Sequence, residues 1–308
     1  MIGAKFRVLD GSVEMRRLLL AAVMFGTASG AQAADMPDFL RGSISAPVTR
    51  NWDGWYVGGQ VDYTSADMDF SHAPKTLTNF MLRNSVLQAP VSQWQALSKN
   101  HAQGTGFGAF VGRNYQWEDL VFGIEANYNY MTNLSSSSSD SMSLRIDNPV
   151  GENPPAGHIH SYDTTLTSKA ALQIKDVVTF RGRAGWASGN FLPYVFGGLA
   201  VGRVDVSRSA TVSYNLFDTY DVTTINVVGG VPISTTRSQT DFLGFNTQSQ
   251  AERRTNSFVA GWTAGLGGEY MLWGNMFMRA EWEYVRFLSV KDISFSTNNV
   301  RAGLGYKF

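Results

Sequence analysis

The chain has 308 residues, no cysteine, and 25 basic residues balanced by 25 acidic ones. The zero net charge argues against a nucleic-acid partner, which requires an excess of Lys and Arg on the contacting surface. The absence of cysteine excludes disulfides and thiolate metal sites. No apolar run in the sequence approaches the roughly 18 residues that a membrane-spanning helix needs.

The amino terminus has the pattern of an export signal. Arg16 and Arg17 precede a short apolar run, Leu18 to Phe25, which is followed by small residues and an A-x-A cleavage site that ends at Ala33. A positive segment, a short apolar core and a small-residue site in this order predict a cleaved signal peptide over the first 33 residues. Met15 is an alternative start, and otherwise the signal is simply long. Both readings give the same mature chain.

The mature chain is organised in stretches of period-two alternation, the pattern of β-strands. Residues 34–53 are polar and are predicted to form a short periplasmic lead-in, before a barrel domain over residues 54–308. Eight strands are predicted, at Gly54–Thr64, Phe107–Trp117, Leu120–Tyr130, Val177–Trp186, Phe191–Val201, Phe258–Tyr270, Met276–Phe287 and Asn298–Phe308. Three polar stretches without sustained alternation are predicted to be long loops, at Ser65–Gly104, Met131–Gln173 and Asp205–Thr255. A serine run in the second loop, Ser135–Ser139, should be solvated and flexible.

Short turns and long loops alternate along the chain, and both chain ends fall on the short-turn side. Outer-membrane barrels have this asymmetry, with an even number of strands. A soluble barrel of the lipocalin type is the alternative, but its outer face should be polar. Here aromatic and aliphatic residues crowd one parity of most strands. The sequence therefore predicts an all-β fold, an eight-stranded antiparallel up-and-down transmembrane β-barrel with long extracellular loops.

The inward parity of the predicted strands carries four acidic and four basic residues. They are Glu125, Arg181, Arg183, Glu269, Arg279, Glu281, Glu283 and Arg301. An eight-stranded barrel is only wide enough for its own side chains, and an unpaired ion buried there costs several kcal/mol. We therefore expect a salt-bridge network that plugs the lumen. The alternative is a gated path for protons or solutes through these charges.

The last strand ends in an aromatic pair, Tyr306 and the carboxy-terminal Phe308, on its apolar face. This ending resembles the sorting signal that the bacterial outer-membrane insertion machinery reads. Tyr306 and Phe308 are thus the predicted assembly signal. The predicted partners are the insertion machinery, outer-membrane lipids and lipopolysaccharide. Oligomerisation stays open, because lipid-facing and partner-facing apolar surfaces look alike.

All four histidines fall in predicted loops, and His158 and His160 are the weak ligand candidates among them. A loop histidine could contact heme iron. Two histidines alone make a weak metal site, because structural zinc sites want four ligands. No residue spacing supports a hydrolase, which needs an activated nucleophile beside a base. The sequence predicts no enzymatic activity, no cofactor and no metal.

Several strand motifs together carry a family resemblance that spans nearly the whole mature chain. They lie at Trp52–Gln60 (WDGWYVGGQ), Gly112–Gln116, Arg181–Trp186, Leu192–Tyr194, Gly197–Gly198, Gly261–Thr263 and Val300–Phe308. With these motifs the chain resembles the RopB-type small outer-membrane barrels of rhizobia and their relatives, within the OmpA-like barrels. The resemblance implies a non-enzymatic surface barrel that tethers or stabilises the envelope and presents interaction loops. The alternatives are a porin-like diffusion channel and a hemin-binding surface protein.

Overall fold

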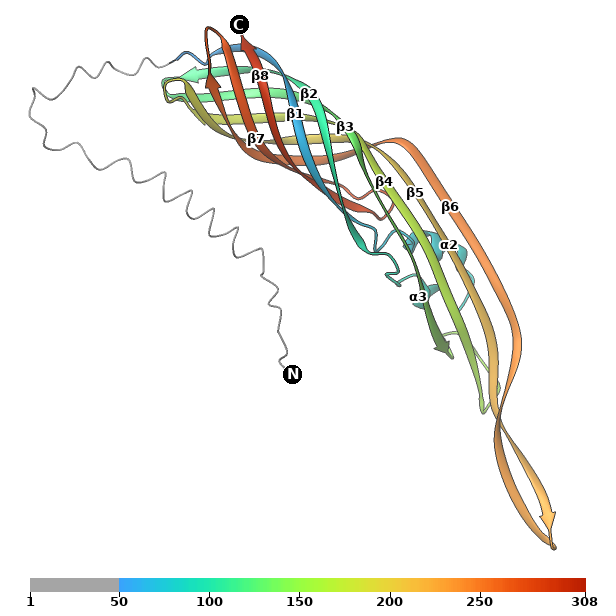
Figure 1. The fold of residues 1–308 in the computed structure, drawn as a ribbon. Helices are drawn as coiled ribbons and strands as arrows, with labels where there is room; N and C mark the ends of the chain where they lie inside the picture. Colours follow the sequence, from blue (N-terminus) through green and yellow to red (C-terminus); the bar gives the residue numbers. More distant parts are fainter. Residues whose placement is uncertain (1–49) are drawn as a thin grey trace, which may run out of the picture. The chain divides into compact units, whose positions relative to one another are not determined.

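The computed structural model describes residues 50–308, which form a closed antiparallel barrel in which every strand pairs with its sequence neighbour and the last pairs with the first (Figure 1). Its strands are β1 (Gly54–Asp69), β2 (Lys99–Trp117), β3 (Leu120–Asp147), β4 (His158–Trp186), β5 (Phe191–Val228), β6 (Val231–Met271), β7 (Met276–Phe287) and β8 (Ser294–Lys307). The predicted fold class is confirmed. The predicted signal peptide and most of the predicted lead-in lie outside the described residues.

The two faces of the barrel wall follow the predicted alternation. On β3, Ile124 is 64% exposed and its neighbour Glu125 is 4% exposed. On β8, Val300 is 60% exposed and Arg301 is 2% exposed. An apolar outer face and a polar inner face are the pattern of a barrel that meets lipid on the outside.

The predicted bounds of the three long loops are wrong, because strands extend into the ends of the first loop and through most of the second and third. The first loop is only Phe70–Ser98, the second only Asn148–Gly157, and the third reduces to the turn Gly229–Gly230. Both turn glycines have positive φ, 61° and 82°, as a tight two-residue hairpin requires. The serine run Ser135–Ser139 is part of β3 and pairs with β4, so the prediction of a flexible loop is also wrong. Ladder hydrogen bonds hold these segments as strands without the apolar alternation that marks strands in lipid.

β-Bulges mark the place where the outward face of the wall changes parity. The register shifts on β3 between Tyr130 and Leu134, and further shifts occur at the same level in the β4–β5 and β5–β6 pairs. Asn133 and Asn256 have positive φ there, 57° and 54°. On β3, β4 and β6 these irregularities exchange the inward and outward parities, so later side chains point to the other face. Beyond the bulges, β3 to β6 continue as the outer extension (residues 134–174 and 206–254), a four-stranded sheet from which the β5–β6 hairpin projects alone beyond Tyr220 (Figure 1).

Two short helices follow β1 and pack on the inner face of the outer extension: α2 (Lys75–Met81) and α3 (Gln88–Val91). Their apolar cluster consists of Leu77, Leu82, Leu87, Val91, Tyr162, Leu166, Ala210 and Val212. A sheet that opens out of a barrel must cover its inner apolar face, and this helical segment covers it. No helix within residues 50–308 is long and apolar enough to cross a membrane.

Arg208 of β5 fastens the helical segment to the rest of the molecule. Its Nη1 atom lies 3.0 Å from three oxygens, the carbonyls of Ala73 and Lys291 and Oδ2 of Asp292. Its Nη2 atom donates to Glu252 at 2.8 Å. Because Lys291 and Asp292 belong to the turn between β7 and β8, this one side chain joins three segments that are distant in sequence.

Candidate functional site: the buried charge layer

The eight inward charges come from five strands, and the register places several of them directly opposite a partner. Glu125 faces Arg181 across β3 and β4, and Glu269 faces Arg279 across β6 and β7. Glu281 faces Arg301 across β7 and β8. Side chains directly opposite each other on one face of an antiparallel pair lie within reach of an ion pair.

These charges form one continuous network across the lumen. Arg181 Nη2 lies 2.5 Å from both Glu125 and Glu281, and Arg279 Nη2 lies 2.7 Å from Glu125. The other pairs are Arg279–Glu269 at 2.6 Å, Arg183–Glu269 at 2.7 Å, Arg183–Glu125 at 3.3 Å, Arg181–Glu283 at 3.5 Å, Arg301–Glu281 at 3.6 Å, Arg279–Glu281 at 3.7 Å and Arg301–Glu283. None of the eight side chains is more than 1% exposed. Every carboxylate is therefore neutralised without solvent.

Aromatic side chains complete the layer. The hydroxyl of Tyr56 donates to Glu125 at 2.6 Å, and the hydroxyl of Tyr194 donates to Glu281 at 2.5 Å. The Arg279 guanidinium lies 3.7 Å from the ring centre of Phe110. The tyrosine hydroxyls give the carboxylates further hydrogen bonds, and the aromatic ring faces attract the guanidinium groups, in addition to the ion pairs. The period-two pattern put Tyr56 on the inward face, whereas the mixed parity of β5 concealed Tyr194.

Apolar clusters close the barrel interior on both sides of the charge layer. On the short-turn side, Trp52 is 1% exposed and packs with Val121, Leu192 and Met271. On the other side, a larger cluster includes Leu134, Ile174, Val204, Val285, Phe287 and Phe295. The interior is thus stratified into apolar, charged and apolar layers. This arrangement places buried apolar side chains on both sides of the ion pairs.

The predicted assembly signal lies at the seam where the barrel closes. Tyr306 and Phe308 are 46% and 70% exposed, and their ring centres are 5.3 Å apart. The backbone N–H of Phe308 donates to the carbonyl of Trp55 on β1 at 2.8 Å. The two rings therefore stand on the outer apolar face beside the first strand.

The two candidate ligand histidines lie on β4, so their predicted loop position is wrong. Nδ1 of His158 is 2.7 Å from Asp218, and Nδ1 of His160 is 2.6 Å from Glu152. The pKa of Glu152 lies below its ordinary range, because hydrogen bonds from His160 and Tyr162 outweigh its partial burial. Within residues 50–308 there is no cluster of three or more His, Asp or Glu side chains that could hold a metal ion.

Comparison with known proteins places this architecture in a family. The chain is 26% identical to the 31 kDa outer-membrane immunogenic protein of Brucella melitensis, over 96% of this chain and the whole of that protein. It is 26% identical to the 22 kDa outer membrane protein of Rhizobium leguminosarum bv. viciae, over 84% of this chain and 79% of that one. Among solved structures it matches Neisserial surface protein A with 14% identity and a TM-score of 0.33, over 83% of this chain and 97% of that chain.

The match to a family model is almost as long as the chain. The model of the outer membrane protein beta-barrel domain covers residues 18–308. The outward apolar belt and the closed ring of eight strands are features of barrels that lie in the outer membrane. The chain belongs to the outer membrane protein beta-barrel family and is a protein of the cell outer membrane.

Proposed function

We propose that the protein is a closed, non-enzymatic structural barrel that stabilises the envelope and presents its outer extension as an interaction surface. The observation that carries this proposal is the charge layer, in which no side chain is more than 1% exposed. A permeation path needs water or exchangeable ligands along the lumen. Here Glu125 and Glu281 are instead held by arginines and tyrosines from facing strands.

The energetics of the layer favour a structural role. Removing one partner of a buried ion pair is strongly destabilising, because the remaining charge stays in a medium that cannot solvate it. Glu125 alone contacts Arg181, Arg183 and Arg279, so opening the lumen would disrupt several pairs together. A gate built on these charges would have to offset that whole cost at each opening.

The geometry around the candidate histidines supports a role outside catalysis. His158 and His160 each use Nδ1 to bind a carboxylate, which resembles half of a catalytic triad. Within the described residues, no hydroxyl hydrogen-bonds to either ring. A hydrolase of this type needs a nucleophile in contact with the base.

Single-channel conductance of the refolded protein in a planar bilayer tests the proposal against the channel alternative. We expect no conductance steps from protein whose insertion is verified by β-rich circular dichroism. Reproducible steps that change in Arg181→Gln or Glu281→Gln would establish a permeation path through the lumen. Glu118→Gln, an exposed change in the β2–β3 turn, is the matched control.

A further inference from the structure

The β5–β6 hairpin ends in an exposed apolar turn at the far end of the outer extension (Figure 1). The last residue pair between β4 and β5 joins His158 to Tyr220, so beyond it the hairpin is a ribbon of two strands. The nine residues 225–233 at its end are here called the hairpin tip. Five aliphatic side chains there are between 48% and 69% exposed: Ile225, Val227, Val228, Val231 and Ile233.

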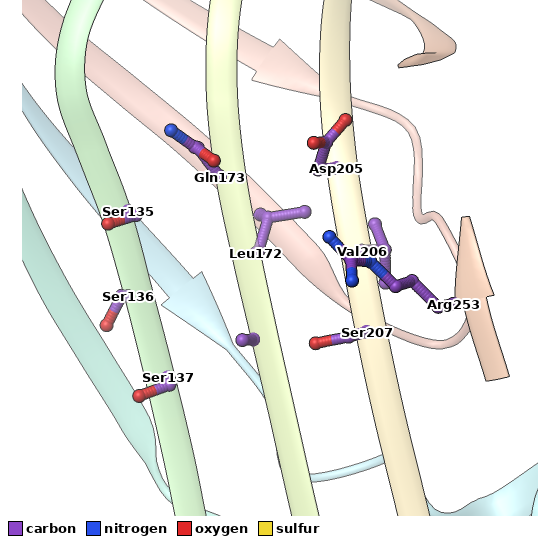
Figure 2. Close-up of a pocket in the computed structure, with 10 residues that line it drawn as sticks. Ser135, Ser136, Ser137, Leu172, Gln173, Asp205, Val206, Ser207 and Arg253 are labelled. Atoms are coloured by element: carbon purple, nitrogen blue, oxygen red, sulfur yellow. The ribbon is translucent and has the colours of Figure 1, made fainter. Parts of the chain in front are cut away.

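The hairpin tip differs from the wall of the outer extension. Figure 2 shows part of the outward face of that wall, where Ser135 and Ser137 of β3 and Ser207 of β5 stand on the sheet surface. Small polar side chains of this kind suit a surface in water. Exposed aliphatic side chains that cluster together, unlike single ones, mark an interaction site.

The hairpin tip is apolar on both faces of the ribbon. Residues directly opposite each other in an antiparallel pair share a face, and the faces alternate along each strand. The strand register therefore gives the two faces three apolar residues each: Val228, Val231 and Ile233 on one, and Ile225, Val227 and Pro232 on the other. A flat protein surface covers only one face of a ribbon, whereas lipid surrounds both.

Neutral side chains separate the hairpin tip from the nearest charges. No charged residue occurs in residues 222–236. Just below the tip, the hydroxyls of Thr223 and Thr236 lie 3.0 Å apart, and Thr224 stands opposite Thr235. The hairpin thus passes from an apolar end to a collar of hydroxyls before it reaches charge. This composition suits hydrocarbon at the end of the hairpin and water at the collar.

The dimensions of the hairpin tip also favour lipid over a protein partner. A stable protein interface uses about 20–30 residues from each partner, and the tip has nine. From Val228 to Ile225 the strand rises about 10 Å. Apolar segments that lie in a bilayer interface are buried to about 5–10 Å, which the tip matches.

The open edges of the ribbon set the depth that the tip can reach. Within residues 50–308, no third strand pairs with the hairpin beyond Tyr220. Unpaired backbone N–H and C=O groups are costly in the hydrocarbon core, where water cannot bind them. The hairpin tip therefore fits the interface of a bilayer and does not fit a structure that spans one.

We propose that the hairpin tip inserts into the interface of a second lipid bilayer, one that faces the cell surface. The barrel's own membrane lies at the other end of the strands, because β5 runs about 80 Å from Val204, at the level of the bulges, to Val228 (Figure 1). The inference rests on the proposed role of the outer extension as an interaction surface and names the partner of that surface.

Flotation of the refolded protein, held in nanodiscs, with separate protein-free phosphatidylcholine vesicles tests the proposal. We expect the native protein to float with the vesicles. Val228→Asp with Val231→Asp should weaken binding about tenfold or more, because the two carboxylates stay in water. Val228→Leu with Val231→Leu should bind as the native protein does.

Leu243→Asp with Phe245→Asp is the matched control. It also replaces two exposed apolar side chains by carboxylates, but Leu243 lies ten residues from Ile233, about 33 Å further down the strand. We expect this variant to bind normally. Equal losses in both Asp variants, each shown to be folded by the heat-modifiable gel shift, would overturn the proposal.

The lipid and the salt concentration provide a further test. Because the hairpin tip carries no charge, we expect equal binding to vesicles with and without phosphatidylglycerol, and no loss of binding in high salt. Binding to anionic vesicles alone would overturn the proposal, and so would a native protein that binds no vesicles. Either failure would leave the closed barrel intact, since the conductance measurement tests it separately.

Discussion

The inner barrel has eight strands, and the outer extension continues four of them, β3 to β6, with the opposite polarity. In the inner barrel the outward face is apolar and the interior is charged, as Ile124 and Glu125 illustrate. In the outer extension the outward face is polar and the interior is apolar, as Ser135 and Leu134 illustrate. The surroundings explain both patterns. Lipid around the inner barrel favours apolar outward side chains, and water around the outer extension favours polar ones.

The difference also lies in how each interior is closed. The charge layer lies inside a closed ring of strands, five of which supply its ions, and each charge is paired. The outer extension is an open sheet, and its inner face is covered by α2 and α3 through apolar contacts. We therefore expect the barrel to be sensitive to changes of charge and the outer extension to be sensitive to loss of its cover.

The largest expected effect concerns closure of the barrel, on which both regions depend. Tyr306→Ala with Phe308→Ala removes the aromatic pair at the seam between β8 and β1. We expect most of the folded protein to be lost from the outer membrane, as measured by the heat-modifiable gel shift of membrane fractions. Phe80→Ala, an exposed aromatic change on α2, should assemble normally. Normal levels of the double variant would contradict the assembly-signal reading.

The next effect tests the charge layer. Glu125→Gln leaves Arg181, Arg183 and Arg279 with one carboxylate fewer in a dry interior. We expect a loss of about 3–5 kcal/mol in the free energy of unfolding, measured in urea with the protein in lipid vesicles. Glu118→Gln, in the exposed turn, should have no measurable effect. An unchanged urea midpoint for Glu125→Gln would mean that the network does not stabilise the barrel.

A smaller and local effect should follow loss of the Arg208 contacts. Arg208→Ala leaves the buried carbonyl of Ala73 without this donor, and unsatisfied buried groups cost about 1–3 kcal/mol each. We expect faster amide exchange and protease cleavage in residues 70–98, with no change in the exchange of β1 or β8 inside the barrel. Arg237→Ala serves as the exposed control. If Arg208→Ala accelerated amide exchange in β1 and β8 as much as in residues 70–98, the helical segment would not be a separately destabilised region.

The smallest expected effect is a pH dependence of protease cleavage in residues 70–98. Hydrogen bonds from Lys291 and Arg208 lower the pKa of Glu252 to about 2. A carboxyl whose pKa is depressed in the folded state contributes stability above its unfolded pKa and loses it as the pH falls through the folded value. Cleavage of residues 70–98 should therefore rise from about pH 4.5 towards pH 2. Glu252→Gln should raise cleavage at neutral pH and flatten its pH dependence.

The inner barrel could be predicted from the sequence because lipid imposes a strict alternation on each strand. Ile124 and Glu125 could be assigned to opposite faces from parity alone, and so could every charge of the layer. The outer extension lacks that constraint, since water tolerates Ser, Thr and Gln on either parity. The bulges at Asn133 and Asn256 also reverse the face of all later side chains, so no single period describes β3 or β6. The sequence pattern therefore predicts loops where strands occur.

Arg208 joins an early segment of the chain to its last hairpin. The helical segment after β1 lies early in the chain. Arg208, which binds the carbonyl of Ala73 in this segment, also binds Lys291 and Asp292 in the last hairpin. A barrel that lacks this hairpin cannot complete the contact. Ordering of the helical segment through Arg208 is therefore coupled to the placement of the last hairpin of the barrel.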